Sequence, residues 1–218
     1  MLRLPVLCLE VCVKFYRTFA VVAGLLTASV AAVAGPSDFR FYMVHTQIFF
    51  SVSHLNYSHP LGRMHVKGGY FRFDPDDWSN SKVDATIDIA SLDMGDEAWN
   101  NKLRTAFFDV STYPTAHYVS TKVEKTGERT GVVHGNLTLL GKTHPVDLQV
   151  TFNRAGTDGY SLRYIAGFAA TAAFKRSTWG MTRSIPDNGD DVSIHIEVEG
   201  IRDGDAQKQA PADSAEHP

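Results

Sequence analysis

Apolar and polar side chains alternate with a period of two over most of the chain between residues 39 and 198. Ile87 and Ile89, for example, flank Asp88. Because successive side chains of a strand point to opposite faces, this pattern predicts antiparallel strands with one apolar and one polar face. The candidate segments are 39–44, 48–53, 64–73, 83–89, 118–123, 133–139, 146–152, 168–174 and 192–198. About eight or nine strands separated by turn residues favour a sandwich or a barrel, and closure into a barrel removes exposed edges.

One segment departs from this alternation. From Asp96 to Thr105, Trp99 and Leu103 lie four residues apart behind an aspartate, which predicts a short amphipathic helix. Two phenylalanines follow at once, so we expect this helix to pack onto one end of the barrel. The segment 203–218 is polar and lacks apolar periodicity, and we expect it to be disordered. The sequence thus predicts one all-β domain over residues 35–202.

The segment 1–34 resembles an export signal. Lys14 and Arg17 precede the uncharged apolar stretch 18–33, and small residues stand at both recognition positions of Ala32-Val33-Ala34. We expect cleavage after Ala34, a periplasmic or secreted location by bacterial export, and no stable membrane anchor afterwards. An uncleaved anchor is the alternative, although the apolar run is short of the ~20 residues that a spanning helix needs.

Charge and cysteine content narrow the possible chemistry. The net charge is −3, and it becomes −5 without residues 1–34, which hold three basic and one acidic side chain. An acidic domain offers no basic field for a phosphate backbone, so no nucleic-acid partner is expected. Both cysteines, Cys8 and Cys12, precede the predicted cleavage point. The exported domain would therefore contain no disulfide, thiol nucleophile or cysteine-bound metal.

No catalytic or metal-binding motif stands out. The stretch 135–143, GNLTLLGKT, resembles a phosphate-binding loop, but it has one residue too many between its glycines. Pro145 also follows where that motif needs a helix. The serines lack the G-x-S-x-G setting, and the histidines lack metal-ligand spacing. We therefore predict a protein that is not an enzyme, with no catalytic residue, no metal site and no cofactor.

The predicted inward face combines large apolar residues with small ones. The large residues are Ile48, Phe50, Val52, Ile87, Ile89, Leu137, Leu139, Leu148, Val150, Phe152, Phe168 and Phe174, and the small ones are Ala85, Gly135, Ala170 and Ala172. Because an eight-stranded barrel is just wide enough to hold one small ligand, this mixture predicts an apolar cavity. His54 continues the inward row of residues 48–52. It is either a core residue with a hydrogen-bond partner or a contact for a polar ligand head group.

The chain resembles the YceI-like family of secreted, lipocalin-like proteins that bind polyisoprenoids and similar lipids. The matching stretches are 50–55, 62–64, 71–75, 87–92, 103–104, 107–110, 113–114, 120–121, 135–143, 145–146, 167–168 and 176–181. Asn100-Asn101, Met64 and Trp179 depart from the family's usual residues. The resemblance implies an all-β, eight-stranded antiparallel barrel enclosing a tunnel for an isoprenoid chain, and the helix predicted above would pack at one end of it.

The resulting hypothesis is a periplasmic carrier that holds a polyisoprenoid, or an isoprenoid quinone, in the apolar tunnel. His54 and Arg176 are the candidates for contacting the head group, and a charged head would favour Arg176. Arg176 equally suits an ion pair with an aspartate in the turn 187–191. Three other classes stay open. They are a stress-response or partner-binding barrel with a filled core, an enzyme that acts on an amphiphilic substrate, and an electron-transfer protein that works through a bound quinone.

Overall fold

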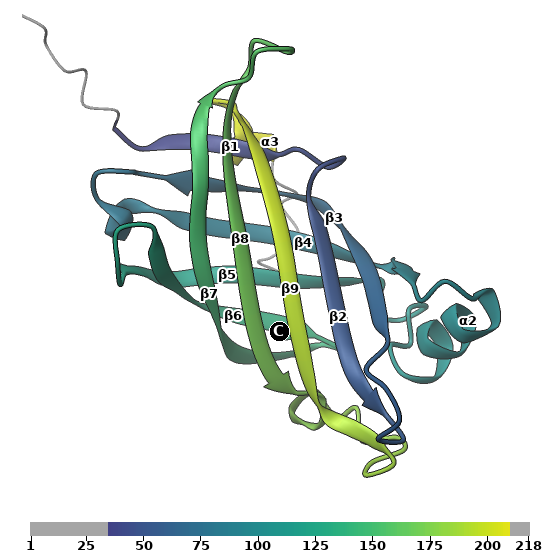
Figure 1. Cartoon of the computed structure of the whole chain (residues 1–218). Helices are drawn as coiled ribbons and strands as arrows, with labels where there is room; N and C mark the ends of the chain where they lie inside the picture. Colours follow the sequence, from purple (N-terminus) through teal and green to yellow (C-terminus); the bar gives the residue numbers. More distant parts are fainter. Residues whose placement is uncertain (1–34, 210–218) are drawn as a thin grey trace, which may run out of the picture. The chain divides into compact units, whose positions relative to one another are not determined.

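Residues 35–209 fold mainly into antiparallel strands in the computed structural model, which describes this part of the chain (Figure 1). The predicted signal segment, 1–34, and the last residues, 210–218, lie outside the described residues. The strands are β1 (Ser37–Phe41), β2 (Gln47–His54), β3 (Leu61–Phe73), β4 (Lys82–Asp93), β5 (Thr115–Lys125), β6 (Thr130–Leu139), β7 (Lys142–Thr157), β8 (Tyr164–Lys175) and β9 (Asn188–Arg202). The helical segments are η1 (Trp78–Asn80), α2 (Glu97–Ala106), η2 (Arg176–Trp179) and α3 (Ala206–Gln209).

Nine strands form a barrel with eight strand positions. Strands β4 to β9 pair each with the next along the chain, and β3 pairs with β4. Both β1 and β2 are antiparallel to β3 and to β9, on different stretches of these partners. They therefore share one position between β9 and β3 and close the barrel. The predicted eight-stranded antiparallel barrel is confirmed.

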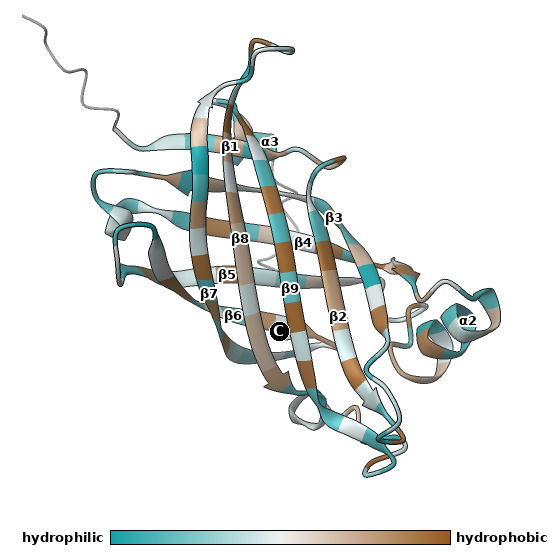
Figure 2. Cartoon of the chain, in the orientation of Figure 1, coloured by the Kyte–Doolittle hydropathy of each residue, from teal (hydrophilic) through white to brown (hydrophobic). Residues whose placement is uncertain are grey.

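The strand faces follow the predicted alternation, which the banding of Figure 2 makes visible along β2 and β9.

Aromatic side chains gather where β1, β3 and β8 meet. Phe39 stacks on Phe71 with ring centroids 5.0 Å apart, and Phe73 meets Phe168 edge to face at 4.9 Å. Such pairs contribute beyond their buried area. This cluster joins β1, β3 and β8 across the interior of the barrel.

The predicted helix is present as α2, one residue later than expected, at one end of the barrel (Figure 1). Asp96 is its N-cap and accepts a hydrogen bond from the Trp99 N–H at 2.8 Å. Asn100 is buried and accepts from the Met94 N–H at 2.6 Å, while Arg104 donates to the Leu92 carbonyl at 2.6 Å. These bonds hold the helix against the end of β4.

The polar C-terminal segment differs from the expectation over residues 203–209. Asp203 donates its backbone N–H to the Asp38 carbonyl at 2.9 Å, and its carboxylate lies 3.5 Å from Arg40. Ala206 is buried at the start of α3. Polar contacts with β1, rather than an apolar face, place this segment, which is why periodicity did not predict it. Within residues 35–209, none of the helices has the length and apolar character needed to traverse a membrane.

Candidate functional site

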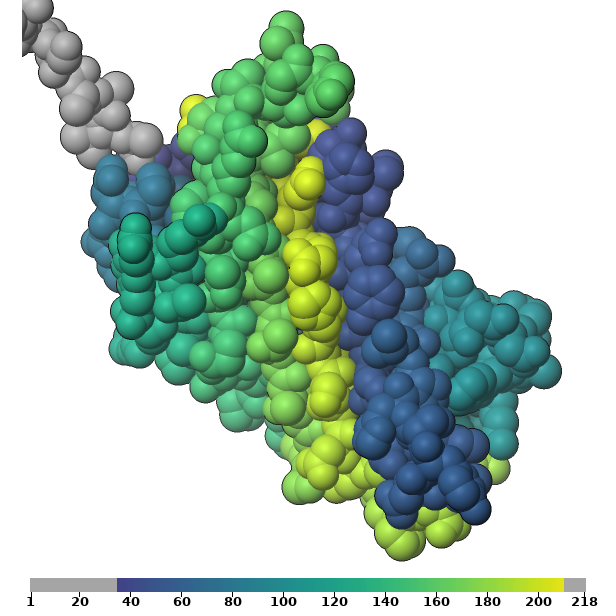
Figure 3. Space-filling view, viewed as in Figure 1, coloured from purple at the N-terminus to yellow at the C-terminus, as the bar shows by residue number. Residues whose placement is uncertain are grey.

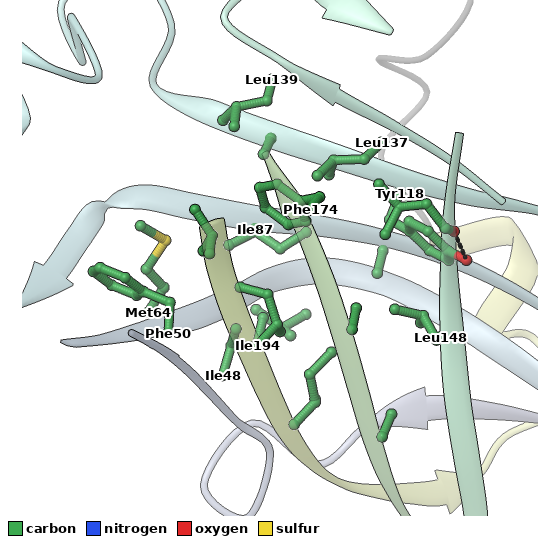
Figure 4. A pocket seen from close by; sticks show the side chains of 18 of the residues that line it. Ile48, Phe50, Met64, Ile87, Tyr118, Leu137, Leu139, Leu148, Phe174 and Ile194 are labelled. Carbon is green, nitrogen blue, oxygen red and sulfur yellow. Dashed lines mark hydrogen bonds between the residues drawn. The ribbon is translucent and has the colours of Figure 1, made fainter. Parts of the chain in front are cut away.

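The barrel contains an apolar cavity of about 330 Å³ (Figure 4). Its volume lies within the range of ordinary small-molecule sites. Eleven of the twelve large residues that the alternation turned inward line it. They are Ile48, Phe50, Val52, Ile87, Ile89, Leu137, Leu139, Leu148, Val150, Phe168 and Phe174. The interior is therefore not filled, which contradicts the alternative of a barrel with a solid core.

Phe152 is the exception among the twelve. Its ring lies 5.0 Å from that of Phe73 and 5.4 Å from that of Phe168, and the Arg129 guanidinium lies 5.9 Å from its centroid. The register of β7 against β8 shifts between Phe152 and Arg154. Phe152 thus belongs to the aromatic cluster and not to the cavity wall.

The small residues divide between two roles. Ala85, Ala170 and Ala172 line the cavity as expected. Gly135 does not, because the ring of Tyr118 covers it, and a Cβ at Gly135 would lie 2.4 Å from Tyr118 Cζ. The Tyr118 hydroxyl lies 3.0 Å from the carbonyl oxygens of Val133 and Val146, and burial raises the pKa of this phenol. The glycine makes room for a buried tyrosine rather than for a ligand.

Several lining residues were not among the predicted ones. β9 contributes Ile194, Ile196 and Val198, whose alternation was visible in the sequence. The helix α2 contributes Trp99 and Leu103, the two residues that its helical spacing places on one side. Their placement in the wall required the tertiary structure, since spacing alone does not tell which element closes the cavity.

His54 lines the cavity but is exposed, so its interpretation as a core residue is wrong. The register of β2 against β9 shifts between Val52 and His54, which ends the inward row. The imidazole ring lies 6.0 Å from the ring of Trp99 on α2. His54 therefore stands at an end of the cavity, between β2 and the helix.

Arg176 is 4% exposed and directs its donors to backbone carbonyls. Nε donates to Gly189 at 2.8 Å, Nη1 to Met181 at 2.6 Å, and Nη2 to Arg183 at 3.0 Å and Asn188 at 3.1 Å. Burial lowers the pKa of this guanidinium, and the charge of Asp190 opposes that effect.

Asp190 and Asp191 of the 187–191 turn have other partners. Asp190 accepts from the N–H and the hydroxyl of Ser177, both at 2.8 Å, and Asp191 accepts from Lys175 at 2.8 Å. Burial alone would raise the pKa of Asp190, but these hydrogen bonds and the nearby cations lower it. Arg176 thus holds the loop 181–189 to η2 through carbonyl groups, and not through the expected aspartate pair.

The charged side chains among the lining residues are all basic. Arg72 Nε donates to Asp38 Oδ1 at 2.7 Å, and Lys82 Nζ lies 3.4 Å from Gln207 Oε1. Arg176 donates to the backbone carbonyls named above. No aspartate or glutamate within residues 35–209 lines the cavity. No group of three or more potential metal ligands occurs in the same residues. The site is thus an apolar compartment with few polar groups in its lining.

Comparisons with known proteins agree with this architecture. The model of the YceI-like domain family matches residues 39–200. A UPF0312 protein of Serratia proteamaculans is 36% identical over 187 residues, which are 83% of this chain and 96% of that protein.

Two solved structures show the same fold. The BcnA structure from Burkholderia cenocepacia has a TM-score of 0.64 and 24% identity, and the match covers 73% of this chain and 98% of that one. A polyisoprenoid binding domain from Saccharophagus degradans has a TM-score of 0.56 and 14% identity, over 76% of this chain and 98% of that one.

Proposed function

Because the chain belongs to the YceI-like domain family, we propose that it binds a polyisoprenoid or a similar long-chain amphiphile inside its barrel. The observation that carries the proposal is the apolar cavity of about 330 Å³, whose lining includes no carboxylate. The related fold of a polyisoprenoid binding domain supports the same class of ligand. Long apolar chains are sparingly soluble in water, so a compartment of this kind suits a carrier.

Burial of the chain would supply most of the affinity. Each CH₂-sized group moved from water into an apolar site contributes about 0.8 kcal/mol. About ten buried carbon atoms therefore correspond to roughly micromolar binding before the entropic costs of association are subtracted. Such a ligand needs no strong polar contact, which agrees with the scarcity of polar groups in the wall.

The cellular location of the protein and the roles of His54 and Arg176 are parts of this proposal. We place the protein in the periplasm or outside the cell, with an isoprenoid lipid or quinone as its ligand and no catalytic step. His54 is the head-group candidate that remains accessible. Arg176 retains only one of its five N–H donors for a ligand, so its main part is to shape the loop 181–189.

Two neighbouring alanines of β8 allow a matched test. Ala172 lines the cavity, whereas Ala173 is exposed on the outer face. Ala172→Phe should reduce the uptake of an added prenol or quinone by at least tenfold, because the new ring occupies the volume of several ligand carbon atoms. Ala173→Phe should bind as the unchanged protein does. Native mass spectrometry followed by organic extraction gives the stoichiometry and identifies the ligand. Failure of the unchanged protein to take up either lipid, or equal uptake by both variants, would overturn the proposal.

A further inference from the structure

Two loops at one end of the cavity carry exposed apolar side chains. Leu55 and Tyr57, in the β2–β3 loop, are 46% and 88% exposed, and Leu61 at the start of β3 is 67% exposed. Ile185, in the loop before β9, is 36% exposed. We refer to these four residues as the rim. Figure 3 shows the blue β2–β3 loop and the yellow-green loop before β9 together at the lower end of the molecule.

The rim is one surface because its two loops are bonded to each other. The Leu55 N–H donates to the Asp187 carbonyl at 3.0 Å, and His54 is paired with Asn188 across the β2–β9 register. The same segments also supply cavity wall, since His54, Pro60 and Asn188 are lining residues. Exposed apolar side chains thus stand directly beside the residues that line this end of the cavity.

Neither burial nor backbone preference accounts for a leucine at position 55. Leu55 has a φ of 51°. This is the left-handed region of backbone conformation, which disfavours residues other than glycine, asparagine and aspartate. Asparagine would suit this backbone better, and Asn56 follows it with a φ of 58°. The turn therefore holds an apolar side chain in water at a strained position. Leu162 is strained and exposed in the same way, but Leu55 differs from it because its neighbour His54 lines the cavity.

The charge pattern of the loop identifies the kind of surface that it fits. Residues 53–61 contain no Asp, Glu, Lys or Arg, although the chain as a whole is 21% charged. The segment combines leucine with tyrosine and histidine, whose apolar bodies and polar tips suit the boundary between lipid chains and head groups. A bilayer holds apolar chains beneath a layer of polar head groups. The rim likewise presents apolar side chains, one of them with a polar hydroxyl, beside an apolar cavity.

We propose that the rim docks this end of the barrel onto the surface of a lipid bilayer, where a long apolar chain enters and leaves the cavity. The inference rests on the proposed function, because a bilayer is where such a chain resides. Docking lets the chain pass between two apolar environments without full exposure to water. That exposure would otherwise oppose exchange by about 0.8 kcal/mol for each CH₂-sized group.

The chain contains its own control at the tip of the β7–β8 hairpin. Tyr160 and Leu162 are 101% and 78% exposed, which is more than Tyr57 and Leu55, and the φ of 57° at Leu162 is close to that of Leu55. None of residues 158–163 lines the cavity. The rim variant is Leu55→Asn with Tyr57→Ser, and the tip variant is Leu162→Asn with Tyr160→Ser. Because asparagine tolerates a positive φ, neither variant should lower the thermal midpoint of unfolding.

The test measures flotation of the unloaded protein with phosphatidylcholine vesicles and transfer of a fluorescent prenol between two vesicle populations. The rim variant should lower the vesicle partition coefficient by about tenfold, as expected for the loss of two partly buried side chains, and should slow transfer. The tip variant should change both by less than twofold.

Equal effects of the two variants, or absence of flotation by the unchanged protein, would overturn docking. A rim variant that alters a monomer–dimer equilibrium without vesicles, but not flotation, would assign the rim to self-association and also refute the proposal. Uptake of detergent-dispersed prenol, measured separately, distinguishes the two proposals. If uptake is intact while flotation is absent, only docking fails, whereas absent uptake refutes the proposed function itself.

Discussion

Replacing Arg176 with alanine tests whether this residue holds the loop or contacts a ligand. The guanidinium is buried and makes four hydrogen bonds to carbonyl groups between Met181 and Gly189. Arg176→Ala leaves these carbonyls without their donor at a site from which water is largely excluded. Breaking a buried charged network of this kind costs about 3–5 kcal/mol. For a domain of this size, that loss corresponds to a fall of roughly 6–20 °C in the thermal midpoint of unfolding.

The assay compares denaturant unfolding of three variants with the unchanged protein. Arg176→Lys keeps the charge but cannot reproduce the fork of donors, so its free energy of unfolding should lie between those of the unchanged protein and Arg176→Ala. Lys175→Ala is the neighbouring control. It removes only an exposed ion pair with Asp191, and we expect little change in stability.

Ligand selectivity, measured on the same variants, separates the two roles of Arg176. The reasoning is refuted if Arg176→Ala unfolds within about 0.5 kcal/mol of the unchanged protein, a change typical of a surface substitution. If that variant also discriminates differently between a prenol and a prenyl diphosphate, Arg176 is a head-group contact and not a structural one.

Two further changes test the packing and the charge balance outside the cavity. Gly135→Ala should destabilise the domain by about 1–3 kcal/mol, because the new Cβ would lie 2.4 Å from Tyr118 Cζ. Gly159→Ala, with no heavy atom within 4 Å, should be nearly neutral, and equal denaturation midpoints for both would contradict this account. Asp74 has a lowered pKa because the Asn80 amide and two backbone N–H groups donate to its carboxylate. Its stabilising contribution is therefore present above the pKa of the unfolded carboxyl, near 4, and is lost as the pH falls through the folded value. Asp74→Asn should lose less stability than the unchanged protein between pH 5 and pH 3 in urea titrations, and an equal loss would show that Asp74 does not contribute.

The strand pattern was predictable because alternation reports directly which side chains face inward in an antiparallel sheet. It placed eleven residues correctly on the cavity wall, from Ile48 to Phe174. The helix at residues 97–106 was predictable for a similar reason, since its capping aspartate and its apolar spacing are both local. Local patterns thus sufficed wherever the backbone stayed regular.

The errors arose where distant contacts override a local pattern. The inward row of β2 ends at His54 because the register of β2 shifts against β9. The sequence of one strand does not show how it is aligned with the neighbouring strand. The space beside Gly135 belongs to a tyrosine on a neighbouring strand, which the sequence of β6 does not reveal. Phe152 packs against Phe73 and Phe168, and these two rings, rather than Phe152, line the cavity.

Arg176 links the cavity, which it helps to line, to the rim. The carbonyls of Arg183 and Asn188, to which it donates, bracket Ile185 and Asp187. Asp187 in turn accepts the N–H of Leu55, so one buried cation holds both loops that carry the rim. A loosened loop should therefore weaken vesicle docking as well as stability, whereas loss of a head-group contact would leave docking by the unloaded protein unchanged. Flotation of a folded Arg176→Lys protein without ligand separates these two cases.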